Sequence, residues 1–433
     1  MVIENEYCEK CNEKYTSTFN KWWCKSCQIN DLKKNFTNWT SRNITIDNFI
    51  QMMQLKINSR YDIIFEWIPY NQFSNIKEIG KGGFATIYSA TWKDGPLSYD
   101  CEYIRDKKKV ALKQLYNSEN ITIEFLNEVK GYSIGIFKYV LSIYGISQNP
   151  DTKNYVMVLD YAEGGDLYNW VNKYYNKLDW LYNIKALLSI IEGLEIVHQE
   201  NMVHRDFHTG NILSMYNTLD NYIICVSDMG LCGKVDSTDK TEIYGVMPYV
   251  APEVLRGKPY TQAADIYSFG MIMYYVATGR KPFCNCAHDE ILVLDICKGI
   301  RPEINEPEAP KCYIDLMKRC WNSNPNNRPK ATEIKELIEL FYDSYSSNLK
   351  SEKDELLSFD INEQFEKAEE YKESNFLFLE EKRQSATHPQ AVYTSRLLNP
   401  FTKDLPKYDL NSECLDCELF ISSNNFIYYK QLN

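Results

Sequence analysis

Two short polar loops, each following an apolar strand-like run, constrain the fold of this chain more than any other feature of its sequence. The first lies within "MVHRDFHTGNIL" and the second within "IICVSDMGL". Polar residues flanked by buried strands are held in fixed positions, which is what pre-organised catalytic groups require. The sequence therefore predicts that catalytic side chains lie in these two loops.

A glycine cluster earlier in the chain points to a phosphate site. Apolar alternation on both sides of it predicts a strand, a turn and a second strand in "IKEIGKGGFATIYSA". Gly80, Gly82 and Gly83 let the backbone approach a phosphate without a Cβ clash, although an ordinary hairpin turn has the same composition. Lys113 follows in the apolar run "KKVALKQL", where a buried ammonium needs a phosphate or carboxylate, and Glu128 of "EFLNEVKGY" offers a carboxylate.

The distribution of apolar residues predicts two lobes. From Asn75 to about Tyr342, strand-type alternation comes first and long helical periods follow.

No stretch approaches the roughly 18 continuous apolar residues that cross a bilayer, and the N-terminus lacks a basic head followed by an apolar run. We therefore expect no membrane span and a cytoplasmic location, with the nucleus as the other candidate. The net charge of −11 disfavours nucleic acid as a partner, because proteins that bind nucleic acid usually carry a basic face.

The motifs occur together in one order: the glycine loop, the "VALK" lysine, the "HRD…N" loop, "DMG" and "APE". In that order and at those separations, the region from Asn75 to about Tyr342 resembles a eukaryotic protein kinase. The resemblance implies an α+β, bilobal fold with a small β-rich N-lobe and a larger helical C-lobe. It also implies an enzyme that uses ATP and Mg²⁺ and has proteins as substrates.

The resemblance gives each matching residue a role. Lys113 would hold the α- and β-phosphates, with Glu128 orienting it. Asn211 and Asp228 would bind Mg²⁺, and Asp206 would accept or orient the proton of the substrate hydroxyl. The remaining nucleotide-binding positions cover the phosphates or surround adenine, and they are Gly80, Gly82, Gly83, Ile87, Ala111, Leu159, Ala162 and Leu213.

Three further residues match positions with architectural roles in the family. Glu253 and Arg328 would form a buried ion pair, and Asp265 would brace the backbone of the catalytic loop. Met229 replaces the usual Phe of "DFG", and its flexible thioether is able to fill that space.

The catalytic loop departs from the family pattern. His208 stands where serine/threonine kinases carry Lys, and Gly210 stands where tyrosine kinases carry Arg. Val246 stands where serine/threonine kinases usually have a Thr that bonds the loop aspartate and lysine. One explanation is a pseudokinase scaffold that binds ATP or partners without efficient catalysis. We favour an active enzyme, because the metal- and phosphate-binding residues are present and His208 is able to donate a hydrogen bond or a partial charge, although a packing role for it is equally good.

Two segments resemble the tyrosine kinase-like group, whose members mostly phosphorylate Ser or Thr. They are the hinge region "YAEGGDL" and the pair Cys320–Trp321. We therefore expect serine/threonine specificity, with tyrosine as the alternative.

Arg205 precedes Asp206, an arrangement in which a phosphate on the activation segment is paired by the arginine, so an upstream kinase is a candidate partner. The candidate acceptors are Ser237, Thr238, Thr241 and Tyr244.

Cysteine pairs near the N-terminus predict a zinc knuckle. Cys8 and Cys11 form one C-x2-C pair, and Cys24 and Cys27 form another twelve residues later, so four thiolates are able to surround one Zn²⁺. The alternative is a reduced, loosely ordered arm. We expect the knuckle to contact protein, with Trp22 and Trp23 as candidates. This arm, the "FEWIPYNQF" linker and the tail "THPQAVYTSRLLNPFTKDLP" resemble an expanded kinase family of mycorrhizal fungi.

The C-terminal region is expected to contain an amphipathic helix. Asp360 and Glu363 resemble a helix-start capping box, and Phe365 falls on an apolar face; packing on its own domain is favoured over a dedicated partner-binding helix. Cys414 and Cys417 have no second pair nearby and are assigned no role. We expect four regions: a knuckle at 1–28, a linker with a helix at 29–71, the kinase domain at 72–343 and an acidic, partly disordered tail at 344–433.

Overall fold

The computed structural model describes residues 7–15, 23–82, 85–100, 102–116, 118, 123–132, 139–219, 223–234, 242–346, 355–403 and 405. Among the predicted residues, Gly83, Ser237, Thr238, Thr241, Trp22, Cys414 and Cys417 lie outside this part. The chain forms two compact units. The first comprises Met1–Lys173, Glu192–Glu200 and Gly210–Cys232, and the second Tyr174–Ile191, Asn201–Thr209 and Gly233–Asn433.

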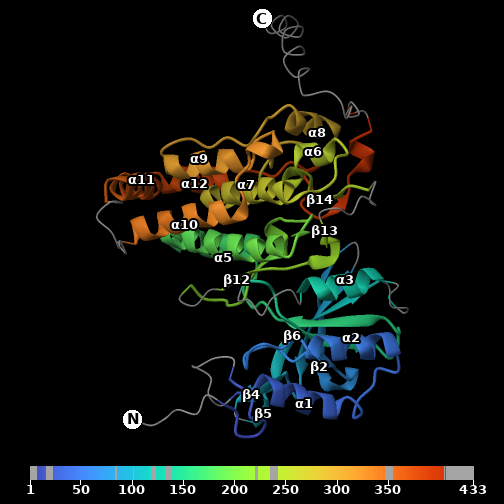
Figure 1. Ribbon diagram of the computed structural model, residues 1–433. Coiled ribbons are helices and arrows are strands. Elements are labelled where there is room, and N and C mark those ends of the chain that lie inside the picture. Colours follow the sequence, from blue (N-terminus) through green and yellow to red (C-terminus); the bar gives the residue numbers. More distant parts are fainter. Residues whose placement is uncertain are drawn as a thin grey trace, which may run out of the picture. The chain divides into compact units, whose positions relative to one another are not determined.

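The first unit is built on a six-stranded sheet with the order β1-β7-β8-β6-β3-β2 (Figure 1). Strand β8 in its middle is apolar on both faces, and every residue of "YVMVL" in it is buried. This explains why the sequence there reads as a continuous apolar run rather than as alternation. The strands are β1 (Glu66–Trp67), β2 (Phe73–Lys81), β3 (Ala85–Trp92), β6 (Lys108–Leu115), β7 (Ile143–Gln148) and β8 (Tyr155–Asp160).

Smaller elements complete this unit. Strands β4 (Leu97–Asp100) and β5 (Glu102–Arg105) form a two-stranded ribbon. A three-stranded sheet has the order β12-β11-β9, with β9 at Gly165–Asp166, β11 at Ile212–Ser214 and β12 at Ile224–Val226. The helices are α1 (Lys25–Asn35), α2 (Ile44–Gln54), α3 (Ile123–Tyr132) and α4 (Leu167–Tyr174), whose last residue belongs to the second unit.

The segment before the glycine loop is part of the first unit's core. Helix α2 lies in this segment, and the Asn43 side chain caps it by accepting from the amides of Thr45 and Ile46. On its buried face, the ring of Phe49 lies edge-on to the ring of Phe65, with 6.0 Å between the ring centroids. The adjoining Glu66–Trp67 strand pairs in parallel with β7. The linker thus contributes a strand to the main sheet.

The second unit is mainly helical and centres on α7 (Gln262–Thr278), in which fourteen of the seventeen residues are buried. The first half of α5 (Trp180–Gln199) belongs to this unit, together with α6 (Pro252–Leu255), α8 (Glu290–Cys297), α9 (Lys311–Cys320), α10 (Ala331–Tyr345), α11 (Glu355–Ser374) and α12 (Phe376–Arg383). Its strands form two pairs, β10 (Met202–Val203) with β13 (Gly233–Lys234) and β14 (Tyr244–Gly245) with β15 (Arg396–Leu397). The expected α+β class, with a β-rich N-lobe and a helical C-lobe, is confirmed.

The predicted ion pair between Glu253 and Arg328 is formed inside the second unit. The guanidinium of Arg328 donates to both carboxylate oxygens of Glu253 at 2.6 and 2.7 Å. It also donates to the carbonyl oxygens of Ala263 and Asn322. Because the Arg328 side chain is fully buried, these partners are what make its charge tolerable there.

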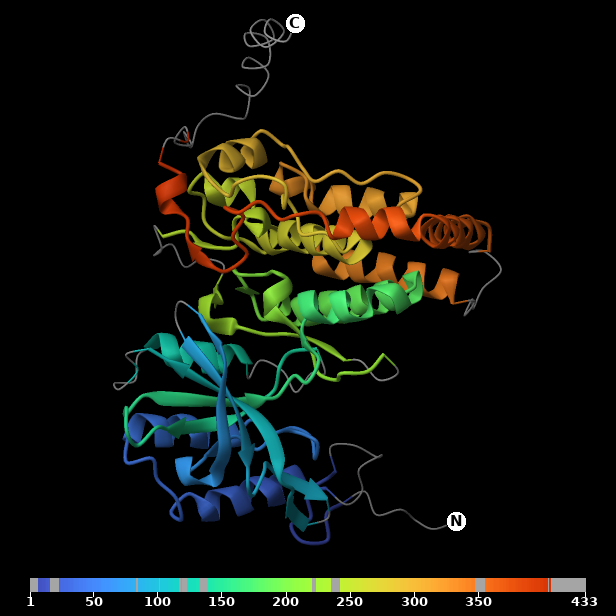
Figure 2. The ribbon, with the colours of Figure 1, turned by 180° about the vertical axis from the view of Figure 1, so that it is seen from behind.

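Helices α11 and α12 pack on their own unit, as expected (Figure 2). Phe365 is fully buried and contacts the rings of Trp180, Phe341 and Tyr345. The predicted helix start was wrong: α11 begins at Glu355, so Asp360 lies inside the helix and accepts from the side chain of Gln364. Acidic residues three apart, such as Asp360 and Glu363, occur inside helices as well as at helix starts, because residues three and four apart are neighbours on the helix surface. No helix in the described ranges combines the length and apolarity needed to cross a bilayer.

The chain beyond α12 returns along the second unit and is anchored by His288. The His288 ring is buried and contacts the backbone of Val392 through Nδ1 and the carbonyl of Phe283 through Nε2. Burial lowers the pKa of His288 below its ordinary value of 6.5, and nearby Arg396 lowers it further, while Asp289 and the backbone hydrogen bonds oppose the shift. The folded chain therefore favours neutral His288.

This shift predicts loss of stability in mild acid. Below about pH 6.5 the unfolded chain takes up a proton at His288 before the folded chain does, so the free energy of unfolding falls until the folded pKa is passed. The limiting slope is about 1.4 kcal/mol per pH unit. Calorimetric unfolding across roughly pH 5 to 8 measures it, with His288→Asn as the variant. An equally steep decline in His288→Asn would contradict the assignment.

Candidate active site

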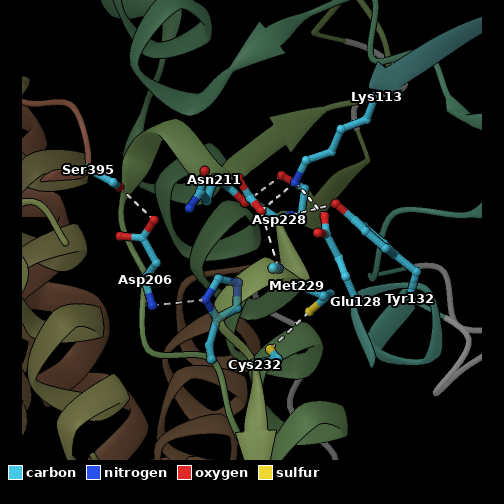
Figure 3. A network of polar contacts seen from close by, with 12 residues as sticks. Lys113, Glu128, Tyr132, Asp206, Asn211, Asp228, Met229, Cys232 and Ser395 are labelled. Carbon is cyan, nitrogen blue, oxygen red and sulfur yellow. Dashed lines mark hydrogen bonds and ion pairs between the residues drawn. The ribbon is translucent and has the colours of Figure 1, made fainter. Parts of the chain in front are cut away.

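Lys113 is the centre of a charge cluster in the first unit. It lies in β6, and its ammonium donates to Glu128 Oε1 at 2.5 Å and to Asp228 Oδ1 at 2.6 Å (Figure 3). The Lys113 and Glu128 side chains are almost fully buried, whereas the Asp228 side chain is 43% exposed. The cluster thus has a buried end and an end that faces solvent.

The pKa values of the cluster follow from this arrangement. Burial opposes the charge on Lys113, but the carboxylates of Asp228 and Glu128 outweigh it and raise the pKa of Lys113 well above its ordinary value. Burial also raises the pKa of Glu128, and the ammonium of Lys113 opposes that shift. Lys113 is therefore a permanent cation held between two acidic groups.

Asp228 is held in place by a neighbouring amide and by a side chain of α3. It has a left-handed conformation, with φ of 59°. Its amide N–H donates to the hydroxyl of Tyr132 at 2.9 Å, and its carboxylate accepts from the amide of Gly230 (Figure 3). Tyr132 was not predicted as a site residue. It follows Glu128 by four positions in α3, so helical spacing places both on one face and offered a signal for it.

Met229 fills buried space beside α3, in agreement with the role expected for its thioether. It is fully buried. A Cβ added at Gly131 would lie 2.7 Å from the Cβ of Met229, so a side chain at residue 131 would force the two segments apart. Glycine at that position allows the residues around Asp228 to approach the helix that carries Glu128.

The predicted nucleotide-binding residues fall on adjacent strands. Ile87 is the cross-strand partner of Lys113, and Ala111 is the partner of Leu159. Partners in an antiparallel pair share a face, as do residues two apart in a strand, so these four side chains lie on one face of the sheet. Gly80 pairs with Ile87, and the Gly82 amide donates to the Ala85 carbonyl, which confirms the strand–turn–strand.

Leu213, Ala162 and Asn211 lie near the three-stranded sheet. Leu213 is in β11 and pairs with Cys225 of β12, and the Ala162 carbonyl accepts from the amide of Gly165 in β9. The carbonyl of Asn211 accepts from the Ser227 amide at 2.8 Å and from its hydroxyl at 2.9 Å. The structure thus joins the segments of the two proposed metal ligands, Asn211 and Asp228. Carboxylate and amide oxygens are suitable ligands for Mg²⁺.

The part of the catalytic loop up to Thr209 belongs to the second unit. Asp265 accepts from the amides of His204 at 2.8 Å and Arg205 at 3.0 Å, which confirms that it braces the loop backbone. Asp206 and His208 are both nearly buried, and His208 Nε2 lies 3.5 Å from Asp206 Oδ1. The hydroxyl of Ser395, which the sequence did not single out, donates to Asp206 Oδ2 at 2.6 Å (Figure 3).

The four N-terminal cysteines come together in the first unit. Their sulfur atoms all lie within 4.8 Å of one another, with Cys8 and Cys27 at 3.6 Å and Cys11 and Cys24 at 3.4 Å. These distances are far longer than a disulfide and are close to the roughly 3.8 Å between sulfurs around a tetrahedral zinc ion with bonds of about 2.3 Å. The cluster therefore has the geometry and the chemistry of a metal site.

The suggestion that Trp23 contacts a partner was wrong. Trp23 is 3% exposed, and its indole N–H donates to the side chain of Gln28 in α1. A large aromatic next to a cysteine pair has the same sequence pattern whether it packs inward or outward. Here it contributes to the support of the cysteine cluster.

Comparison with known proteins agrees with this geometry. The family model of the protein tyrosine and serine/threonine kinases matches residues 73–338. A probable serine/threonine-protein kinase of Dictyostelium discoideum is 27% identical over 293 residues, which are 66% of this chain and 20% of that protein. Mitogen-activated protein kinase kinase kinase 7 of Homo sapiens is 28% identical over 283 residues, 63% of this chain and 42% of that protein. The chain spans less than half the length of either relative.

The charge cluster predicts a specific effect of Glu128→Gln. The substitution leaves Asp228 as the remaining carboxylate on Lys113. Lys113 is then held less firmly, and Asp228 is less available to bind a metal ion. A charged hydrogen bond contributes about 1.5–3 kcal/mol, so the dissociation constant for Mg·ATP should rise about tenfold to a hundredfold. Titration calorimetry measures it, with the exposed Glu200→Gln as matched control. Equal affinities for Glu128→Gln and wild type would contradict this role.

Proposed function

Because this chain belongs to the protein tyrosine and serine/threonine kinase family, we propose that it transfers the γ-phosphate of ATP to serine and threonine hydroxyls of protein substrates. One observation carries the proposal. The buried ammonium of Lys113 is already held by Glu128 and Asp228, and the Asp228 side chain keeps an exposed side. An arrangement in which one cation is fixed and one carboxylate faces solvent suits a metal-bound phosphate.

The residues of the first unit would bind and orient ATP. Lys113 would donate to the α- and β-phosphates, while Glu128 keeps the ammonium directed and charged. Asn211 and Asp228 would hold Mg²⁺, which neutralises phosphate charge during transfer. The face formed by Ile87, Ala111 and Leu159, together with Ala162 and Leu213, would contact adenine. Gly80, Gly82 and Gly83 would cover the phosphates.

Asp206 would accept the proton of the acceptor hydroxyl. Its carboxylate is nearly buried and receives the Ser395 hydroxyl, and the loop backbone is fixed by Asp265. His208 contributes a hydrogen-bond donor where a lysine is absent. The charge on the transferred group would then be balanced mainly by Lys113 and the metal ion, which supply most of the stabilisation in this chemistry.

The finer assignments follow from the sequence resemblance and from relatives named as serine/threonine kinases. We assign the chain to the tyrosine kinase-like group, working in the cytoplasm on protein substrates under the control of an upstream kinase. A segment at 1–28 would be a zinc knuckle, 29–71 a linker, 72–343 the kinase domain and 344–433 a regulatory tail. The absence of a lysine at His208 and of a hydroxyl at Val246 favours the alternative, a scaffold that binds ATP without efficient transfer.

Phosphate transfer by the purified full chain tests the proposal. With labelled ATP, Mg²⁺ and a generic basic protein as acceptor, we expect phosphoserine and phosphothreonine in the products. Removing a general base usually lowers the rate by about 10²–10⁴-fold, so the transfer rate of the Asp206→Asn variant should be lower than that of the wild type by this factor. The exposed Asp343→Asn is the matched control. If the wild type gives no more phosphorylation than Asp206→Asn, the scaffold replaces the kinase as the better account.

We also assign Zn²⁺ to the cluster of Cys8, Cys11, Cys24 and Cys27. Cys24 and Cys27 lie at the start of α1, and Tyr7 forms a bridge with Lys14 across the turn that carries Cys8 and Cys11. Such a small segment has little apolar core of its own, so a metal would supply much of its stability. The likeness to the mycorrhizal kinase family supports the same assignment.

Metal analysis tests the knuckle. The full chain, purified with reduced thiols from a zinc-supplemented medium, should contain one Zn²⁺ per chain by mass spectrometry, because four thiolates complete a tetrahedral site. Cys24→Ser should lose most of this zinc, whereas Cys286→Ser, far along the chain in the second unit, should retain it. A wild-type zinc content no higher than that of Cys24→Ser would exclude the site.

A further inference from the structure

A residue from the far end of the chain connects the two polar side chains of the catalytic loop. The Ser395 hydroxyl lies 2.6 Å from Asp206 Oδ2 and 3.2 Å from His208 Nε2. These contacts join positions 189 and 187 residues apart. Asp206, His208 and Ser395 therefore form a closed polar triangle, part of which is visible in Figure 3.

The proton positions in this triangle follow from the chemistry of its members. A serine hydroxyl has one proton, and the carboxylate of Asp206 is able only to accept, so the Ser395 proton points to Asp206. The Ser395 oxygen then accepts from His208, which requires a proton on Nε2 of the ring. Ser395 thus fixes the position of the Asp206 carboxylate and the orientation of the His208 ring.

At position 246, the residue of the activation segment that lines the cavity of Asp206 cannot supply this hydroxyl. Val246 is 1% exposed and lines the same small cavity as Asp206, but its side chain is entirely apolar. A carboxylate as buried as Asp206 needs hydrogen-bond donors to remain in place. The hydroxyl that the sequence lacks at position 246 reaches Asp206 from the tail instead.

Backbone pairing holds Ser395 in position on its C-terminal side. Arg396 and Leu397 form β15, which pairs with Tyr244 and Gly245 of β14. The pairing continues outward, because the Leu398 amide donates to the Ile243 carbonyl at 2.7 Å. The Leu398 side chain is fully buried, so this end of the segment is part of the unit's core.

Side-chain contacts hold the segment on both sides of Ser395. The Tyr393 hydroxyl donates to the Pro282 carbonyl at 2.8 Å. The Tyr393 ring lies edge-on to the buried ring of His288, with 4.9 Å between the ring centroids. Arg396 donates to the carbonyl of His288 at 2.7 Å. Because these contacts lie on both sides of Ser395, the segment is an integral part of the fold. A loosely held strand that a substrate displaces would lack them.

From these contacts we infer that Ser395 is a positioning residue for phosphoryl transfer: its hydroxyl holds the Asp206 carboxylate and the His208 ring in the arrangement that the reaction uses. The inference rests on the proposed kinase function. It assigns a catalytic purpose to a tail serine and gives His208 a role as the donor to that serine. Ser395 acts through Asp206 and is not itself an acceptor of phosphate.

Steady-state kinetics of the full chain tests the inference. A carboxylate displaced by about 1 Å is able to lower a rate by about a hundredfold, so Ser395→Ala should lower kcat about tenfold to a hundredfold. The KM for Mg·ATP should change little, because the ATP-binding residues are untouched. The matched control is Thr394→Ala, which removes the adjacent, exposed hydroxyl and should keep the wild-type kcat.

A second-site rescue separates the hydroxyl from general damage to the tail. Val246 lines the same cavity as Asp206, so Val246→Thr places a hydroxyl in that cavity. We expect the double variant Ser395→Ala with Val246→Thr to regain part of the lost kcat, and Ser395→Thr to keep more activity than Ser395→Ala. Thermal unfolding of each variant identifies those that lose activity because they do not fold.

A spectroscopic measurement tests the triangle without using catalysis. The ¹⁵N NMR signals of a histidine ring report which nitrogen carries the proton. In the full chain, His208, assigned by a His208→Gln variant, should be protonated at Nε2, and Ser395→Ala should change its signals while Thr394→Ala leaves them unchanged. Identical His208 signals in wild type and Ser395→Ala would overturn the inference.

Three further outcomes also overturn it, two of them kinetic. A folded Ser395→Ala with wild-type kcat would show that the hydroxyl does not position Asp206. A Ser395→Ala variant that phosphorylates added peptide faster would show that the tail blocks the substrate. Phosphate found on Ser395 of the wild type would make it an acceptor. A wild type with no transfer at all contradicts the proposed function instead, and the NMR result then decides on the triangle separately.

Discussion

The buried ammonium of Lys113 is the group on which the first unit depends most. An unpaired charge in that position would cost several kcal/mol, so the fold must bring carboxylates to it. Glu128 arrives on α3 and Asp228 arrives just after β12, and each bonds the ammonium directly. The requirement to satisfy one cation therefore fixes a helix and a loop against the main sheet. The same requirement prepares the cluster for phosphate, because a fixed cation needs no rearrangement when the ligand binds.

The catalytic loop of the second unit follows the same principle with different partners. Asp265 accepts from two of its backbone amides, and Ser395 donates to one oxygen of its Asp206 carboxylate. Both partners come from distant parts of the chain, one from α7 and one from the tail. The loop is thus positioned by the core of its own unit. His208 and Val246 stand in place of the usual lysine and threonine, and Ser395 of the tail contacts both Asp206 and His208 there.

The sequence predicted the residues whose chemistry depends on type and order, and it missed those that depend on long-range packing. Lys113, Glu128, Asp228 and the ion pair of Glu253 with Arg328 could be assigned because each motif has a fixed spacing from its neighbours. Ser395 could not be found, since a single serine in a polar tail has no periodicity and its partner is 189 residues away. Local patterns are also ambiguous at helix ends, which is why the start of α11 was placed wrongly.

The step of phosphoryl transfer itself is the most direct test of this account. In a rapid-quench, single-turnover experiment, the full chain is mixed with labelled Mg·ATP and an acceptor protein, and the bound nucleotide is followed with time. The account predicts loss of the γ-phosphate to serine or threonine at a rate approaching the 1–100 s⁻¹ that is typical of kinases. ATP that binds but remains intact long after that time would contradict it, and would show that the chain keeps the fold and the charge cluster of a kinase without its chemistry.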